Sequence, residues 1–307
     1  MRPGADELWV ANTEALNLVR FEPNLKGHFA DNRLTRLSLA GGGVTPFDLN
    51  PGLDYALLPN PAAQATALAQ PTAIQFTADG SNVWVAAFAS DRVAKLNALD
   101  ASVLARVDVR TPPSDGSPND SRRMRGPRGL ALHEGLQRLY VLNKLANSIS
   151  VIDTTIAQVI AEIPAGSFDP TPVAVKEGRG ALFDARLSGN GTASCGTCHI
   201  DADRDGLAWD LGDPNGETTT VIGANLASHD TRPQARVMHP MKGPMMTQTL
   251  RGLSPSQLLH WRGDRPTLRH FNPTFRDLIG RRVDSRCGHG RDESLSRHAA
   301  PPSESES

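Results

Sequence analysis

The chain has 307 residues, a formal net charge of −1 and 39% hydrophobic residues. A net charge this close to zero argues against binding to nucleic acid or to an anionic membrane surface, and the sequence has no run of about 18 apolar residues that would predict a transmembrane helix. The length is typical of about two domains, and the 27 Gly and 23 Pro residues predict many turns and short elements.

The first half of the chain repeats itself at a spacing of 56 residues. The stretch from Pro71 to Val107 aligns without a gap on the stretch from Pro127 to Ile163, with apolar residues in alternation and Gly, Asp and Asn at the breaks. Each copy therefore predicts four short strands. Four strands in about 40–50 residues are typical of one blade of a β-propeller; the alternative is a β-sandwich with accidental internal similarity.

Two partial copies flank the complete ones. Leu8–Phe21 begins at the second strand of the pattern and lacks the opening strand, whereas Pro170–Gly178 resembles the start of the second complete copy. Because a propeller closes with about 4–8 blades, we expect residues 1–183 to form an incomplete ring of propeller repeats.

The composition changes after Phe183, where the alternation stops and Cys, His, Met, Trp and Arg become frequent. We expect residues 184–280 to form a second, small and mostly α-helical domain, with helices over Ser254–Trp261 and Pro273–Leu278. Residues 281–307, rich in Arg, Ser, Glu and His, predict a disordered tail. The predicted fold class is therefore multidomain β plus α.

One pentapeptide of the second domain indicates its chemistry. Cys195-Gly-Thr-Cys198-His199 is a C-x-x-C-H sequence, the pattern through which c-type haem is attached covalently. Each thiol can form a thioether with one porphyrin vinyl group, and the adjacent imidazole can bind the iron as the proximal ligand. A zinc site would need two further ligands at finger-like spacing, and a redox dithiol would need a βαβ setting. The third thiol, Cys287, lies in the polar tail, so the pentapeptide predicts one covalent haem c.

A methionine-rich segment offers the iron a sixth ligand. Four of the six Met residues fall within nine positions, namely Met238, Met241, Met245 and Met246. A thioether ligand raises the reduction potential and suits electron transfer, and we place Met245 first and Met241 second. The alternative is that these side chains only pack against the porphyrin or the core.

Other residues could complete the haem site. The rival distal ligands are His239, His260 and His270. Arginines that could pair with haem propionates and tryptophans that could cover the ring edge are Arg251, Arg262, Arg265, Trp209 and Trp261.

An acidic stretch follows the pentapeptide. Asp201, Asp203, Asp205 and Gly206 match the first half of an EF-hand loop, and their oxygen spacing suits Ca²⁺. The twelfth position is Gly212 instead of Glu, so the bidentate ligand is missing. The stretch predicts either a calcium site or a solvated acidic turn.

The haem prediction has a consequence for location. Covalent c-type haem is normally attached outside the cytoplasm, so we expect a periplasmic or extracellular protein, although Met1–Glu7 has no apolar core of a signal peptide. Together with the incomplete ring, this favours a fragment of a longer chain.

With these motifs in hand, the chain resembles bacterial exported proteins that join a β-propeller to a c-type cytochrome domain. The resemblance covers about residues 1–280 and rests on the haem pentapeptide with its acidic continuation, on His239–Gly252 and on His260–Arg265. Tyr140–Asn143 also resembles the Tyr-Val-Thr-Asn repeat of a family of seven-bladed propellers.

The predicted haem domain is similar to one half of the di-haem cytochrome c peroxidases and their methylamine-dehydrogenase-maturing relatives. This similarity implies Cys195 and Cys198 as thioether anchors and His199 as the proximal ligand, and it leaves the distal ligand open. One departure is that the chain has a single C-x-x-C-H motif, whereas the peroxidases need two haems.

Three functions are therefore considered. The first is electron transfer to an unidentified redox partner, with the propeller as a docking platform, and this is the function we expect. The second is a peroxidase or oxidase, which needs an open iron site and a nearby acid or base. The third is a propeller binding module with a structural haem.

Overall fold

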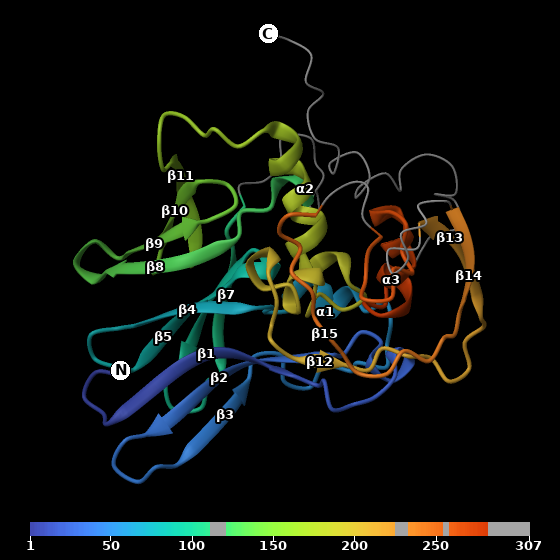
Figure 1. The fold of residues 1–307 in the computed structure, drawn as a ribbon. Helices are drawn as coiled ribbons and strands as arrows, with labels where there is room; N and C mark the ends of the chain where they lie inside the picture. The colour runs from blue at the N-terminus through green and yellow to red at the C-terminus, as the bar shows by residue number, and fades with distance from the viewer. Residues whose placement is uncertain (111–120, 225–232, 254–257, 282–307) are drawn as a thin grey trace.

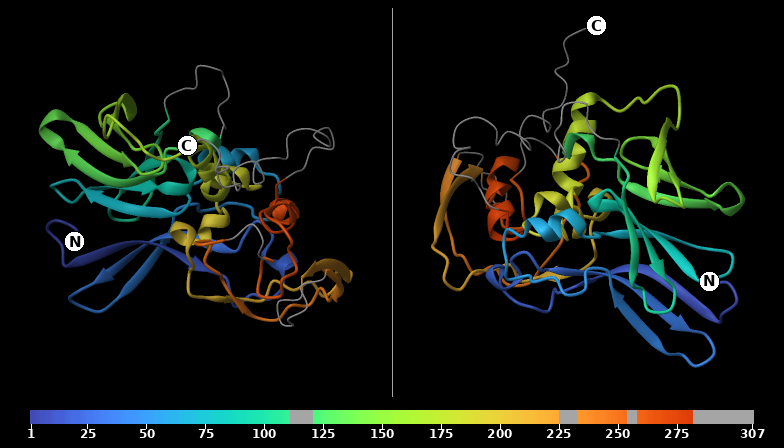
Figure 2. Two further views of the ribbon diagram at one scale, coloured as in Figure 1. Left: turned by 45° about the horizontal axis from the view of Figure 1, so that its top comes forward. Right: turned by 180° about the vertical axis from the view of Figure 1, so that it is seen from behind.

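The structure is a computed structural model that describes residues 1–110, 121–224, 233–253 and 258–281. Three antiparallel sheets fan out on one side of the molecule, and residues 184–281 lie on the other side (Figures 1 and 2). The first sheet contains β1 (Glu7–Ala15), β2 (Ala30–Ser38) and β3 (Val44–Asp48). The second contains β4 (Pro71–Phe76), β5 (Asn82–Ala87), β6 (Arg92–Asn97) and β7 (Val103–Asp108). The third contains β8 (Pro127–His133), β9 (Arg138–Asn143), β10 (Ser148–Asp153) and β11 (Gln158–Pro164).

The second and third sheets reproduce one another at the predicted spacing of 56 residues. Both are four-stranded meanders in which each strand pairs with the next one in sequence. A bulge between Pro71 and Ala73 recurs between Pro127 and Gly129. The left-handed residue Ala101, with φ 57°, recurs at Ala157, with φ 53°. The predicted repeat is thus confirmed down to its irregular positions.

The first sheet confirms the predicted partial copy in its first strand, which contains Trp9, but Leu18–Phe21 forms no strand and β2 begins only at Ala30. Trp9 packs in the cluster between the first and second sheets, together with Val83 and Val85 of β5. Trp84, the next residue along β5, packs instead against Leu139 of the third sheet. Since successive side chains of a strand point to opposite faces, β5 contributes to both interfaces. Sheets that stack in this way have the arrangement of successive propeller blades.

The partial copy expected at Pro170 is not a strand. Val173–Phe183 forms the helix α2, which packs against the short 3-10 turn Ser121–Arg123. Pro170 and Pro172 lack backbone donors for a strand ladder, and residues 173–183 pair with none of the strands in the described part of the chain. A helix satisfies its backbone hydrogen bonds internally, so the segment folds without a partner.

Residues 184–281 are not the mostly α-helical domain that the sequence predicts. Their described part contains the short strands β12 (Ala208–Trp209), β13 (Thr219–Ala224), β14 (Pro233–Met238) and β15 (Met245–Met246), several 3-10 turns and one α-helix, α3 (Asn272–Asp277). Closely spaced Gly and Pro residues between Gly206 and Pro244 break helices, and the run of Thr and Val in β13 favours a strand.

Of the two helices expected in this segment, the one over Pro273–Leu278 is confirmed within one residue at each end as α3. The helix over Ser254–Trp261 is not formed in its described part, because Leu259 makes an isolated β-bridge with Arg265. Residues 254–257 and the predicted tail from 282 onward lie outside the described residues. The described residues contain no helix that is both long and apolar enough to cross a membrane.

Candidate functional site

The predicted haem motif forms a single compact turn. A 3-10 turn spans Cys195–Thr197, and the backbone N–H of His199 donates to the carbonyl of Cys195 at 3.0 Å. The N–H of Ser194 donates to Oγ1 of Thr197 at 3.0 Å and fixes the start of the turn. The two thiols and the imidazole are therefore presented by one short piece of backbone.

This turn lies between two apolar clusters. Cys198 packs against the cluster that contains Phe29, Trp209 and Phe275. On the other side, Gly196 approaches Phe183 so closely that a Cβ at Gly196 would lie 2.5 Å from a ring carbon. The motif is thus held at the junction between the sheets and the C-terminal segment.

Burial keeps the three reactive groups of the motif neutral. It raises the pKa of Cys195 to about 11. Burial, and then the charges of Asp205 and Cys195, also raise the pKa of Cys198. The pKa of His199 is lowered by burial, which the backbone of Asp203 and of Gln248 opposes in part. At neutral pH the site therefore presents two thiols and a neutral imidazole.

The motif residues fit a covalently attached haem. Cys195 and Cys198 are free thiols, as thioether formation requires. Nδ1 of His199 is buried and has no hydrogen-bond partner among the residues that the structure describes. A neutral imidazole with an unpartnered nitrogen has the donor chemistry of an axial iron ligand.

The methionines of the predicted sixth-ligand segment are dispersed. Met245 lies in β15 and pairs with Trp209 of β12, and the carbonyl of Met246 accepts a hydrogen bond from Nε1 of Trp261 at 2.7 Å. Met241 lies in a separate loop, where its N–H donates to Nδ1 of His239 at 3.1 Å. The structure thus gives Met241 and Met245 different surroundings and does not decide between them.

Among the rival histidines, His260 acts on the proposed proximal ligand. The charge of His260 lowers the pKa of His199 further. His260 bonds Asp264 at 2.9 Å and stacks edge-on against Phe271. His270 contacts Oγ1 of Thr267 at 2.9 Å.

The arginines predicted to bind propionates contact protein groups. Arg262 donates to the carbonyls of His239 and Met241 and so ties down the loop between them. Arg251 donates to the carbonyl of Asp201, and Arg265 lies 3.8 Å from Asp264.

The three carboxylates of the predicted calcium site have separate partners instead of converging. Asp201 binds Arg128 and Lys144, and Asp203 faces Arg251 at 3.5 Å. Asp205 accepts hydrogen bonds from Nε1 of Trp209 and the N–H of Leu207. Over the described ranges, no group of three or more His, Cys, Asp or Glu side chains is arranged to hold a metal ion. This arrangement does not favour the calcium site, which stays a prediction.

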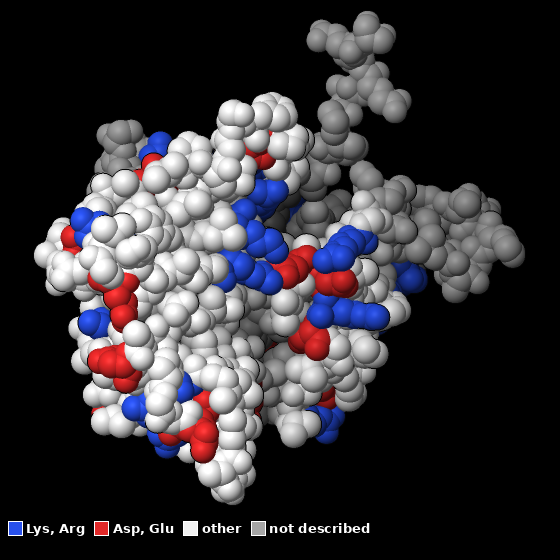
Figure 3. All heavy atoms as spheres, turned by 90° about the vertical axis from the view of Figure 1, so that its left-hand side faces the viewer, with Lys and Arg blue, Asp and Glu red and all other residues white. Residues whose placement is uncertain are grey.

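Residues of the sheets complete the site and were not anticipated. Gln70, just before β4, donates to the carbonyl of Gly196 at 3.3 Å, and Arg128 of β8 binds Asp201. Basic and acidic side chains lie next to one another across the middle of the face shown in Figure 3. These contacts span at least 73 residues of sequence, and no local pattern signals them.

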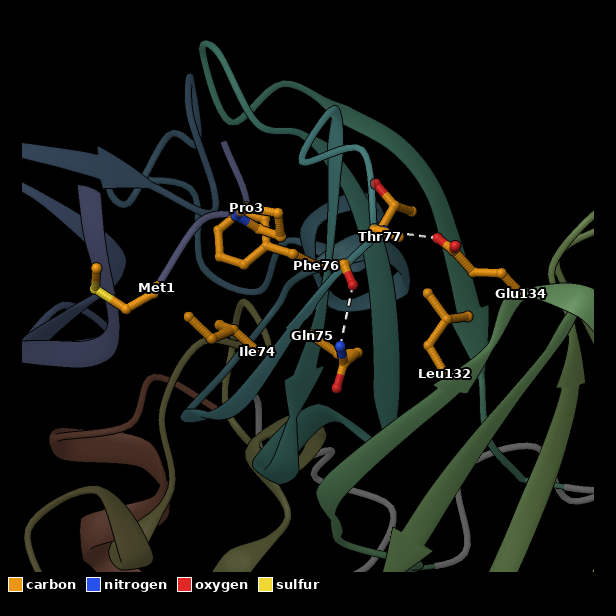
Figure 4. Close-up of a pocket in the computed structure, with 9 residues that line it drawn as sticks. Met1, Pro3, Ile74, Gln75, Phe76, Thr77, Leu132 and Glu134 are labelled. Atoms are coloured by element: carbon orange, nitrogen blue, oxygen red, sulfur yellow. Dashed lines mark hydrogen bonds between the residues drawn. The ribbon is translucent and has the colours of Figure 1, made fainter. Parts of the chain in front are cut away.

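A separate pocket of about 400 Å³ lies between β4 and β8 (Figure 4). Its lining residues include Met1, Phe76, Leu132 and Glu134, and the carboxylate of Glu134 accepts a hydrogen bond from the N–H of Ala78 at 2.8 Å. None of the residues predicted for the haem site lines this pocket.

No protein-family model matches this chain, and no curated protein matches its sequence. Among solved structures, Kuenenia stuttgartiensis hydrazine synthase is similar with 16% identity and a TM-score of 0.32, over 72% of this chain and 48% of that one. Apo AztD from Citrobacter koseri has 16% identity and a TM-score of 0.28, over 44% and 30% of the two chains. The Cps50 (Swd1) β-propeller domain of Myceliophteria thermophila has 15% identity and a TM-score of 0.28, over 46% and 38%. The chain spans less than half the length of each of these structures.

Proposed function

We propose that this chain binds one haem c covalently through Cys195 and Cys198, with His199 as the proximal ligand, and that it transfers electrons to a redox partner. The observation that carries the proposal is the turn at Cys195–Thr197, which presents two neutral thiols and a neutral imidazole from one piece of backbone. The propeller-like sheets serve as the platform on which this turn is mounted.

Each residue of the site has a defined role in this proposal. The thiols of Cys195 and Cys198 anchor the porphyrin, and burial of His199 keeps its ring in the neutral form that binds iron. When bound, haem supplies a one-electron carrier whose potential depends on its axial ligands. Met245 is the first candidate for the sixth ligand and Met241 the second.

The proposal includes a periplasmic or extracellular location, because covalent haem attachment normally takes place there. Gln70 and Arg128 are contacts that favour an electron-transfer role. They fix the motif to the sheets. Rigid positioning of the motif limits the structural change that would accompany a change in the charge of the haem iron.

Covalent attachment is tested by expressing the full chain with export in a host that matures c-type cytochromes. We expect the mass of the purified protein to rise by one haem, and the pigment to survive acid–acetone extraction. Cys195→Ala combined with Cys198→Ala should give colourless protein. Cys287→Ala is the matched control, because it removes the third thiol and should leave the haem in place. Colourless wild-type protein, or pigment that is extracted by solvent, would contradict the proposal.

Electron transfer is separated from peroxidase activity by the visible spectrum and a peroxide titration. We expect low-spin iron, a sulfur–iron band at the red end and no turnover of peroxide. Met245→Ala should remove this band while the covalent haem remains; loss of the band in Met241→Ala instead would move the sixth ligand to that residue. High-spin iron that turns over peroxide would contradict electron transfer and leave covalent attachment intact.

A further inference from the structure

Residues 244–251 form a strap that runs alongside the chain that follows the haem motif. The strap contains β15, which pairs with β12 (Figure 1). Beyond β15, the N–H of Thr247 donates to the carbonyl of Leu207 at 3.1 Å, and the N–H of Leu250 donates to the carbonyl of Ala202 at 3.0 Å. Backbone hydrogen bonds therefore hold the strap edge to edge with the residues that directly follow the motif.

A glycine with a left-handed backbone bounds the strap at each end. Gly243 has φ 73° and Gly252 has φ 72°, values that glycine adopts without the strain that a Cβ would cause. A Cβ at either position would meet no atom of the described residues within 4 Å, so the backbone there can rotate without displacing packed groups. Both ends can therefore absorb a change of φ and ψ, as the hinges of a moving segment do.

The strap lies against the imidazole of the proposed proximal ligand. The backbone of Gln248, in the strap, and the backbone of Asp203 both act on the pKa of His199, which places the ring between these two segments. Nδ1 of His199 is buried. A porphyrin whose iron binds the imidazole needs a flat space beside it, so one of the groups around His199 must move to admit the porphyrin.

The strap is held weakly compared with the thiol side of the motif. Nε1 of Trp261 donates to the carbonyl of Met246 at 2.7 Å, but Trp261 is 63% exposed. Arg251 lies 3.5 Å from Asp203, and its side chain is also 63% exposed. Exposed hydrogen bonds and ion pairs contribute little to stability, whereas Cys198 packs in an apolar cluster. A segment held in the first way opens locally at a low cost in free energy.

We propose that the strap opens about Gly243 and Gly252 to admit the porphyrin to His199, and that it closes again over the bound ring. This movement depends on the proposed covalent haem binding and provides the entry to that same site. Closing carries Met245 toward the ring, because Met245 lies within the strap, whereas Met241 lies outside it. The movement therefore favours Met245 as the residue that meets the second face of the porphyrin.

Hydrogen exchange of the full chain, prepared without haem, measures the opening. The amides of Thr247 and Leu250 should exchange at least about tenfold faster than those of β6, because the largely buried β6 exchanges only when the protein unfolds. Arg251→Gln combined with Trp261→Phe should raise the exchange of the strap by about a further tenfold, since each change removes a contact that holds the strap closed.

Arg276→Gln is the matched control for Arg251→Gln. Arg276 is 59% exposed and binds Asp277 within α3, so its loss should leave the exchange of the strap unchanged. Haem added to the chain with its thiols reduced should bind faster in the double variant, by the same factor as the rise in exchange, because entry of the porphyrin follows opening of the strap.

Two results would overturn this movement and leave the proposed function intact. The first is exchange of the strap no faster than exchange of β6, in a chain that carries covalent haem after export. The second is haem binding that the double variant does not accelerate. A chain that opens its strap but takes up no haem, either after export or when haem is added, would contradict the proposed function and the entry role of the strap together.

Discussion

Arg128 donates two hydrogen bonds to the carboxylate of Asp201, at 2.8 and 2.9 Å. Lys144, in the turn between β9 and β10 of the same sheet, binds the same carboxylate at 2.8 Å. Asp201 follows His199 by two residues, and Asp201 and Ala202 both have positive φ values, 53° and 60°, which are unusual for residues other than glycine. The third sheet thus holds in place the strained segment Asp201–Ala202, which follows the predicted haem ligand His199 in the chain.

Arg128→Ala should loosen this segment. A bidentate, partly exposed ion pair contributes about 1 kcal/mol, so we expect a small loss in the free energy of unfolding that shrinks at high salt. Hydrogen exchange of residues 195–205 should increase more than exchange elsewhere. Arg138→Ala is the matched control, because Arg138 binds Asp153 at 2.7 Å within the third sheet and joins no separate segment. Equal exchange in the two variants would show that the Arg128 pair does not hold the motif.

Gly180→Ala should destabilise the protein through a close backbone approach. A Cβ at Gly180 of α2 would lie 1.8 Å from the carbonyl oxygen of Ser121. Alanine favours a helix over glycine by about 1 kcal/mol, but overpacking against fixed backbone costs about 1–3 kcal/mol, so we expect a net loss measured by thermal unfolding. Gly129→Ala is the control, since its Cβ would meet Leu142 at an ordinary 3.5 Å. An unchanged melting temperature for Gly180→Ala would mean that α2 is free to move.

The repeated sheets could be predicted from the sequence because their signal is local. Alternation of apolar residues, a Trp or Tyr followed by Val, and a constant spacing of 56 residues all lie within single strands and turns. The helix α2 was not predicted, because the sequence from Val173 to Gly178 resembles the start of a repeat. Whether such a segment becomes a strand depends on a partner strand, and none of the described strands pairs with residues 173–183.

Within the candidate site, only the proposed haem-binding motif has a local sequence signal. The spacing of Cys195, Cys198 and His199 is itself the signal. The Arg128–Asp201 pair carries no such signal, because ion pairs between distant segments depend on how the chain folds. The acidic stretch shows the same limit, since spacing alone did not reveal that Asp201 and Asp205 have different partners.

The stability contributed by Asp91 should fall as the pH rises. Asp91 is fully buried and accepts hydrogen bonds from the N–H groups of Arg125 and Gly126. Burial raises its pKa from 3.8 to about 6, although Arg186, 3.3 Å away, acts in the opposite direction. Because the folded-state pKa lies above the ordinary value, this contribution is fully present below about pH 4 and is lost as the pH rises through 6.

Asp91→Asn is the variant that measures this effect. The unfolding free energy of the wild type minus that of Asp91→Asn should decrease between pH 4 and pH 7 by up to about 3 kcal/mol. Chemical denaturation at several pH values gives this difference. Asp54→Asn, at an exposed carboxylate, controls for the loss of one carboxylate elsewhere. A difference that is flat with pH, or that rises, would contradict the raised pKa.

The turns that end β6 and β10 offer a test of the repeat itself. Ala101 and Ala157 occupy equivalent left-handed positions with φ 57° and 53°, a conformation that costs a residue with a Cβ about 1–2 kcal/mol. Glycine adopts it without strain but loses about 0.4–1 kcal/mol through the greater entropy of the unfolded chain. We therefore expect Ala101→Gly and Ala157→Gly each to be neutral or to stabilise the protein by up to about 1 kcal/mol in denaturant unfolding.

Ala161→Gly within β11 is the control and should destabilise the protein, because a strand interior gains nothing from glycine. If both turn variants lose as much stability as Ala161→Gly, the two turns do not share the left-handed geometry, and the structural equivalence of the second and third sheets fails at these positions.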